Sequence, residues 1–163
     1  MQQNTTASHL SKIWSLVYHQ TDGEPKFLLL KSYDSSHQVE RIAPVGNIKS
    51  GENPKDVVLR ETSEIVWIPI NQLNLWVQLP NDKEREKDRD MLYFLLKYSG
   101  DPDAVDITEK GELLWIYKWA TIHEILTLVY SQTIRDVFRD AYQLLKEKNK
   151  KESIKKNFIN SIS

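Results

Sequence analysis

Apolar positions along the first two thirds of the chain form short, β-prone runs separated by polar or glycine-containing segments. Residues 12 to 19 and 26 to 32 have the pattern of strands, and Asp22-Gly23 between them is a strong turn signal, so the sequence predicts an opening hairpin. Further strands are expected at residues 41–44, 73–79, 91–98 and 111–119.

Helix signals occupy the middle and the end of the chain. Asn53 is a typical N-cap residue and Pro54 suits the first helical position, so a helix is predicted from Pro54 to about Val66. Two more helices are expected, one capped by Thr121 and running to about residue 130 and one from 132 to about 148, before a frayed, lysine-rich tail that spans 146–163.

The order of these elements is a hairpin, a glycine loop around Gly46 followed by a helix, more strands, and two terminal helices. This order predicts an α+β fold with a mixed β-sheet sandwiched between α-helices. At 163 residues the chain has the size of one domain, with a core expected at about residues 10–145.

Composition excludes several classes of function. The chain has no cysteine, which excludes disulfides, zinc–thiolate sites and cysteine nucleophiles. Its net charge of -1 argues against a general polyanion binder, and the N-terminus has no signal-peptide pattern. Since no apolar run is long enough to span a bilayer, we expect a cytoplasmic protein without a membrane partner.

The candidate chemistry lies in residues 46–68. Gly46 and Gly51 allow the backbone to turn sharply or to approach a ligand closely. Glu61 and Glu64 are i,i+3 neighbours on the predicted helix, and Arg60 lies four residues before Glu64, within ion-pairing reach. Paired carboxylates of this kind suit a hard divalent cation such as Mg²⁺.

The same run resembles the signature of the Nudix hydrolases, Gly-x5-Glu-x7-Arg-Glu-U-x-Glu-Glu-x-Gly-U, in which U is a bulky apolar residue. The positions that match in register are Gly46, Glu52, Arg60, Glu61, Glu64 and Ile68. Ile65 stands where the second glutamate of the Glu-Glu pair belongs, and Trp67 stands where the glycine belongs.

The resemblance implies a pyrophosphohydrolase that depends on Mg²⁺ or Mn²⁺ and acts on a nucleoside diphosphate linked to another group. It implies that the metal would be held by Glu61, Glu64, Glu52 and the carbonyl of Gly46, and that Glu61, Glu64 and Arg60 would serve catalysis, Arg60 through ion pairs. Residues 43–47 look like the opening found in members that act on dinucleoside polyphosphates, which makes a small nucleotide the expected substrate.

Several alternatives stay open. Ile65 cannot coordinate a cation, which favours a catalytically impaired Nudix-fold module that binds a nucleotide, an RNA end or a protein partner. A carboxylate in the charged segment 82–90 could instead replace the missing one, and Glu109 and Glu112 are rival candidates for a catalytic base. The lysine-rich tail is interpreted as a solvated helix end, the tryptophans as packing residues, and the oligomeric state stays open.

Overall fold

A computed structural model describes residues 11–20, 23–33, 39–66, 68–80, 91–105, 116–129 and 131–162. Within this part, the two predicted opening strands are β1 (Ser11–Gln20) and β2 (Pro25–Tyr33), an antiparallel hairpin in which Tyr18 is paired with Phe27. The other strands are β3 (Val39–Ile42), β4 (Val45–Ile48), β5 (Leu73–Leu79), β6 (Met91–Tyr98) and β7 (Ile116–Ala120). The predictions for Trp67, the 82–90 segment, Glu109, Glu112 and residues 111–115 lie outside the described residues.

The strands form one mixed sheet in the order β3-β2-β1-β6-β5, with β4 paired to β1 and β7 paired to β2. The β1–β6 pair is parallel, and the other pairs are antiparallel. One edge of β1 is shared, because its first residues pair with β4 and its last residues pair with β2. At the point of divergence the amide of Ser15 donates to the carbonyl of Pro44 at 2.9 Å.

The helices are α1 (Pro54–Val66), α2 (Ile122–Leu128) and α3 (Gln132–Ile162), with short 3-10 turns at Ile70–Gln72 and Pro102–Ala104. The predicted cap of α1 is present, since Asn53 Oδ1 accepts a hydrogen bond from the amide of Lys55 at 3.0 Å. Thr121 caps α2, and Glu124 completes a capping box with it.

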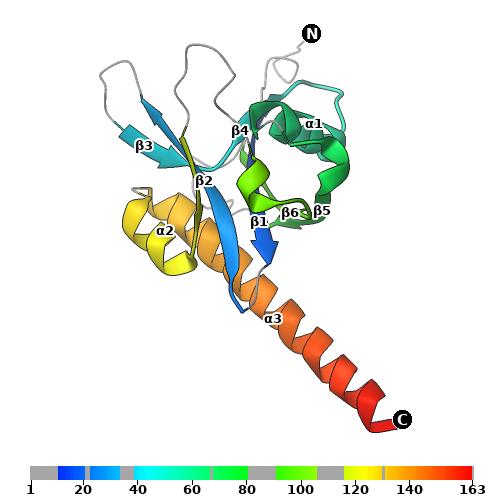
Figure 1. Cartoon of the computed structure of the whole chain (residues 1–163). Coiled ribbons are helices and arrows are strands. Elements are labelled where there is room, and N and C mark those ends of the chain that lie inside the picture. The colour runs from blue at the N-terminus through cyan, green and yellow to red at the C-terminus, as the bar shows by residue number, and fades with distance from the viewer. Residues whose placement is uncertain are drawn as a thin grey trace.

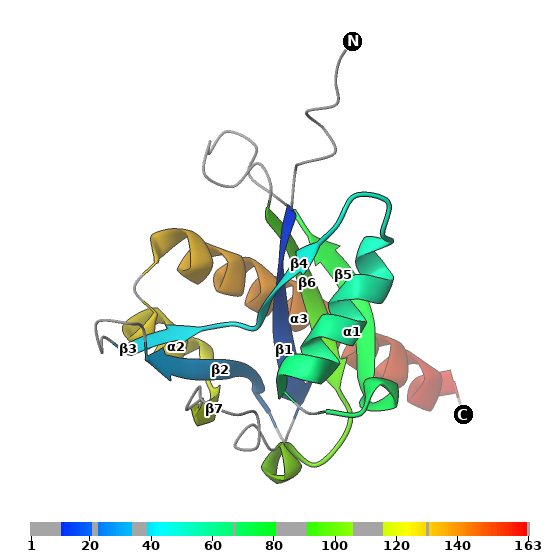
Figure 2. The same ribbon diagram turned by 90° about the horizontal axis from the view of Figure 1, so that it is seen from above.

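Helices cover both faces of the sheet, so the predicted sandwich is confirmed (Figures 1 and 2). Successive strand residues point to opposite faces, and both faces are buried in the central strands. Leu16, Phe27 and Leu95 pack into the cluster that contains α2 and α3. Their neighbours Val17, Leu28 and Leu96 pack into the cluster under α1.

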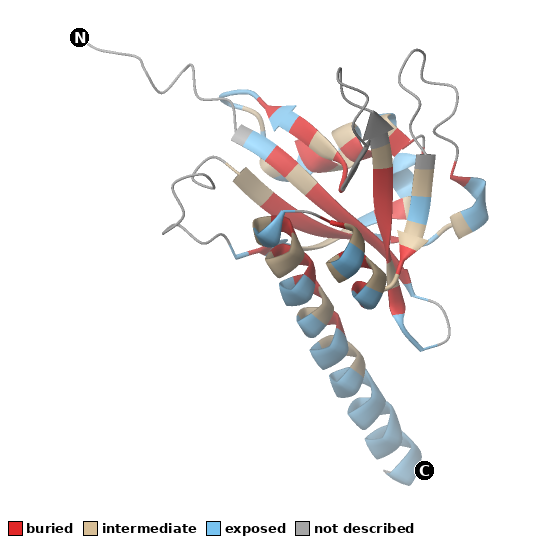
Figure 3. Cartoon of the chain, turned by 90° about the vertical axis from the view of Figure 1, so that its left-hand side faces the viewer, coloured by how far each residue is buried: buried red, intermediate tan, exposed pale blue. Residues whose placement is uncertain are grey.

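Helix α3 differs from the prediction at its end. It continues to Ile162, where the sequence suggested an end near residue 148 and a frayed tail. No glycine or proline follows residue 131, and lysine and glutamate are good helix formers, so nothing in the local sequence stops the helix. Its last turns project away from the sheet (Figures 1 and 3).

The segment around Gly46 also differs from the prediction. Gly46 lies inside strand β4, opposite Ile13 of β1, whereas the sequence suggested a glycine loop. The sharp turn falls at Gly51, whose φ of +88° is a conformation that side chains other than glycine rarely adopt.

No helix in the described part of the chain is long and apolar enough to cross a membrane. The predicted cytoplasmic location stays a prediction.

Candidate functional site

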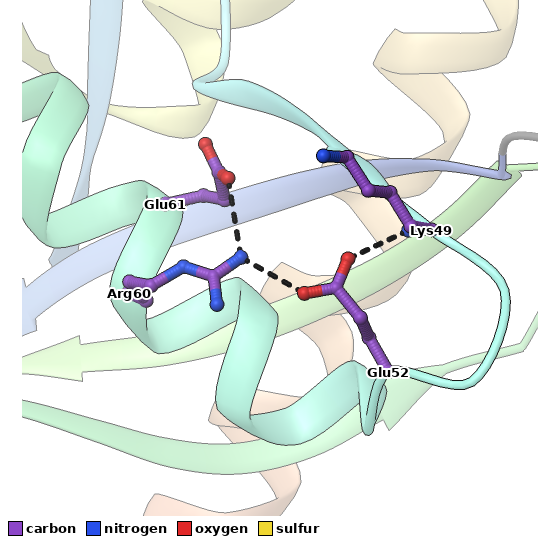
Figure 4. A network of polar contacts seen from close by, with 4 residues as sticks. All are labelled: Lys49, Glu52, Arg60 and Glu61. Atoms are coloured by element: carbon purple, nitrogen blue, oxygen red, sulfur yellow. Dashed lines mark hydrogen bonds and ion pairs between the residues drawn. The ribbon is translucent and has the colours of Figure 1, made fainter.

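The turn before α1 holds the first acidic residue of the site in place. The backbone amide of Lys49 donates to Glu52 Oε1 at 2.8 Å, and the amide of Glu52 donates to the carbonyl of Lys49 at 3.1 Å (Figure 4). This bond from Lys49, followed by that from Arg60, lowers the pKa of the Glu52 carboxyl. Glu52 is therefore ionised and fixed beside the start of α1.

Arg60 joins this turn to the helix. Its Nη2 atom lies 3.2 Å from Glu52 Oε2 and 3.5 Å from Glu61 Oε1 (Figure 4). The bond to Glu52 is the main cause of a raised pKa for Arg60. The spacing placed Glu64 within ion-pairing reach of Arg60, but the turn at Gly51 brings Glu52 alongside α1, and the guanidinium lies between Glu52 and Glu61 instead.

Gly46 and Glu61 lie in close contact across β4 and α1. A Cβ atom added at Gly46 would lie 3.0 Å from Glu61 Cβ, 3.1 Å from Cγ and 3.5 Å from Oε2. A side chain at position 46 would therefore displace Glu61. The structure thus brings together four of the predicted site residues, which are Gly46, Glu52, Arg60 and Glu61.

Two further positions of the motif, Glu64 and Ile65, differ in exposure. Glu64 is exposed, one turn along α1 from Glu61, and among the described residues it forms no ion pair. Ile65 is partly buried and packs against the cluster that contains Val58 of the same helix. Ile65 thus extends the core-facing side of the helix and supplies an apolar contact in place of a metal-binding oxygen.

The donor set for a divalent cation is small in this part of the chain. Among the residues that the structure describes, no three histidine or acidic side chains are grouped so that they could hold a metal ion. Both oxygens of Glu52 already accept hydrogen bonds, so Glu61 and Glu64 on the helix are the main candidate carboxylates for a cation. One or two carboxylates, completed by water and substrate phosphate, are enough for Mg²⁺, which keeps several waters of hydration. The residues present therefore fit a water-rich cation site.

Sequence reasoning missed the role of Lys49. It contributes through its backbone amide, so its side-chain type carries no signal. The sequence clue was Gly51 before Glu52, because a turn at that glycine directs the glutamate back toward the amide three residues earlier.

The described tryptophan in β7 is a packing residue, as predicted for most of the large aromatics. Trp119 stacks on Tyr98 with ring centres 5.8 Å apart and packs edge to face with His19 with ring centres 4.7 Å apart. Its Nε1 donates to the carbonyl of Pro102 at 2.8 Å. Burial is the main cause of a lowered pKa for His19, so this histidine is a buried, neutral residue of the core.

Comparison with known proteins identifies the family. A model of the NUDIX domain matches residues 12–141. The chain belongs to the NUDIX domain family. The prediction of a Nudix hydrolase and of an α+β Nudix fold is thereby confirmed.

Relatives and solved structures of the family are similar at low identity. The asymmetrical bis(5'-nucleosyl)-tetraphosphatase of Mus musculus is 24% identical over 123 residues, which are 74% of this chain and 80% of the mouse protein. A binary complex of the C. elegans Ap4A hydrolase aligns with a TM-score of 0.64 at 21% identity, over 83% of this chain and 97% of that one. The NUDIX domain of Shewanella oneidensis NrtR, complexed with ADP ribose, aligns with a TM-score of 0.61 at 15% identity, over 88% and 94%.

Proposed function

We propose that this Nudix protein hydrolyses the diphosphate linkage of a small nucleotide, a nucleoside diphosphate linked to another group, in a reaction that depends on Mg²⁺ or Mn²⁺. The observation that carries the proposal is the position of Glu61, which lies against Gly46 and within reach of the Arg60 guanidinium. The mouse relative, a hydrolase of dinucleoside tetraphosphates, supports this substrate class.

In this proposal each residue of the site has its own role. Arg60 pairs with Glu61 and limits its rotation, while Glu52 holds Arg60 from the other side. Glu61 and Glu64 would hold the cation, with Glu52 and the carbonyl of Gly46 as further oxygen donors. When bound, a divalent cation neutralises charge on phosphate oxygens and lowers the pKa of a bound water.

Glu61→Gln tests the proposal. We expect the wild-type chain to release phosphate-containing products from diadenosine tetraphosphate or ADP-ribose in the presence of Mg²⁺ or Mn²⁺. The variant should lose at least about 100-fold in kcat/KM, because an amide gives up the charge that binds the cation and pairs with Arg60. Glu147→Gln is the matched control, since Glu147 is an exposed glutamate on α3. A wild-type chain that is inert across a broad nucleotide panel would contradict the proposal.

A second candidate function is supported by Ile65. Ile65 packs against the core, and among the described residues no three histidine or acidic side chains are grouped so that they could hold a metal ion. Both observations fit a module that binds a nucleotide, an RNA end or a protein without hydrolysis. Calorimetry distinguishes the two functions: nucleotide binding with no turnover, unchanged by Mg²⁺ or Mn²⁺, favours the second.

A further inference from the structure

The side chains of the last turns of α3 are exposed. Asn149 Nδ2 donates to Gln20 Oε1 at 3.4 Å, and Lys148 Nζ lies 4.8 Å from the Trp76 ring, but side chains 150 to 161 are all exposed. We call residues 150–162 the helix extension. At 1.5 Å per residue it is about 20 Å long, and it projects from the domain (Figures 1 and 3).

The extension carries large apolar side chains in water. Ile154 is 59% exposed, Phe158 64% and Ile159 56%, and among the described residues Ile70 is the one other large hydrophobic residue exposed to this degree. With 3.6 residues per turn, Ile154 and Phe158 lie more than about 100° around the helix axis from the centre of the stripe that packs on the sheet, while Ile159 lies on the side of that stripe but is exposed. Their own domain therefore leaves all three exposed.

The end of the chain is also strongly basic. Residues 146–163 contain six lysines and two glutamates, a net charge of +4 in a chain whose net charge is -1. Lys150, Lys155 and Lys156 point to different sides of the helix, at successive steps of about 100° per residue. Each exposed apolar residue has a lysine one turn before it, as Lys150 precedes Ile154 and Lys155 precedes Ile159. The apolar tip is thus surrounded by positive charge.

This distribution of charge indicates which kind of partner the extension binds. Two copies of the extension, each with four lysines and one glutamate, would place two net charges of +3 side by side if they packed against each other. A shaped acidic groove on a protein would pair with the lysines on one side of the helix only. A surface with spread negative charge attracts the lysines on every side of the helix. The helix is only about 10–12 Å wide, so even the lysines on its far side lie near the surface on the scale of the Debye length, which is about 8 Å at physiological salt.

We propose that the helix extension binds the surface of an anionic lipid bilayer. Ile154, Phe158 and Ile159 enter the boundary between headgroups and acyl chains, and the lysines extend their stems toward lipid phosphates. The sequence suggested no membrane partner because no run is long enough to span a bilayer. A helix that lies in the interface needs no such run.

Vesicle co-sedimentation of the full chain tests this surface. We expect binding to vesicles of phosphatidylcholine mixed with phosphatidylglycerol, much weaker binding to phosphatidylcholine alone, and a fall in binding as salt rises. The apolar variant Ile154→Ser/Phe158→Ser/Ile159→Ser should bind anionic vesicles at least about tenfold more weakly. Ile70→Ser is its matched control, an equally exposed isoleucine on the domain.

A second pair of variants tests the charge. We expect binding to anionic vesicles to be lost in the variant Lys150→Gln/Lys151→Gln/Lys155→Gln/Lys156→Gln. The variant with arginine at the same four positions should keep this binding. The control Lys55→Gln/Lys97→Gln, on the domain, should bind as the wild type does. Circular dichroism and the thermal midpoint show that each variant is folded. A wild-type chain that does not bind anionic vesicles at low salt would overturn the proposal. The proposal would also be overturned if the wild-type chain formed a dimer without lipid and the apolar variant were a monomer under the same conditions.

Discussion

At the scale of single residues, the site depends on one short contact and one missing oxygen. Gly46 lets strand β4 approach Glu61 more closely than any residue with a side chain would, and Ile65 fills with a hydrocarbon the position where the family signature has a glutamate. The first feature holds the candidate catalytic carboxylate in position. Isoleucine at position 65 reduces the number of oxygen ligands that are available to a cation.

Gly46→Ala tests the contact. The added methyl group must displace Glu61, because Glu61 Cβ is fixed on α1 only 3.0 Å away. We expect a loss of about 1–3 kcal/mol in the free energy of unfolding and a lower hydrolytic rate per folded molecule. Gly51→Ala is the control: its φ of +88° makes alanine strained, but no atom lies within 4 Å. Urea unfolding and steady-state kinetics measure both effects. A Gly46→Ala variant with wild-type stability and rate would show that Glu61 moves without consequence.

Ile65→Glu tests the missing ligand. The carboxylate would lie one helical turn after Glu61, and it would replace an apolar side chain that packs against the core. Without metal we expect a lower thermal midpoint, and with Mn²⁺ a partial recovery together with tighter metal binding than in the wild type. Ile65→Gln loses the same packing without the charge and is the matched control. Equal metal affinity in the two variants would mean that no cation site remains beside Glu61.

At the scale of elements, α3 has two parts with different environments. Its first half closes the core, where Phe138 is fully buried and meets Phe27 edge to face at 5.4 Å between ring centres. Its second half is the exposed extension that carries Phe158. The same residue type therefore occurs in both environments on one helix.

This contrast gives a prediction with a built-in control. Phe138→Ala should lower the free energy of unfolding by about 3–5 kcal/mol, because it empties a large volume in the core. Phe158→Ala should change it by less than about 0.5 kcal/mol, since the ring is in water in the free chain. Urea unfolding of both variants measures the difference. Equal effects would mean that the extension packs against the domain in solution.

Elements could be predicted from sequence wherever local signals decide them. The strands of the hairpin, β5 and β6 follow from apolar runs, and the start of α1 follows from Asn53-Pro54. The end of α3 could not, because the lysines and asparagines near residue 148 fit the end of a helix as well as its interior, and no glycine or proline decides between them. The place of Gly46 in β4 and the partner of Arg60 depend on tertiary contacts: glycine is needed at 46 because α1 lies against it, and Glu52 comes alongside α1 only after the turn at Gly51.

At the scale of the whole molecule, the central strands serve two cores, one under α1 and one under α2 and α3. Tyr18 of β1 belongs to the second core, near the point where α3 leaves the domain. Burial, and after it the charge of Glu152, raises the pKa of Tyr18 from 10.0 to about 12. The ionised form of this side chain is therefore disfavoured in the folded protein.

The raised pKa predicts a loss of stability in alkali. Because the folded-state pKa lies above the unfolded one, the contribution of neutral Tyr18 is complete below about pH 10 and is lost as the pH rises toward about 12. Tyr18→Phe has no hydroxyl to ionise, so its free energy of unfolding should fall less over the same interval. Urea unfolding of both chains from about pH 9 to about pH 12 measures the difference. Parallel losses would mean that other groups govern alkaline unfolding.

The parallel pairing of β1 with β6 also affects how the chain folds while it is being synthesised. Lys12 pairs with Met91, so the second edge of β1 has no partner until the ribosome has added the intervening residues. At about 5–20 residues per second this interval lasts about 4–16 s. During it the nascent hairpin and α1 lack the strand that completes their sheet, and an open apolar strand edge of this kind is a site for chaperones or for mispairing with another nascent chain.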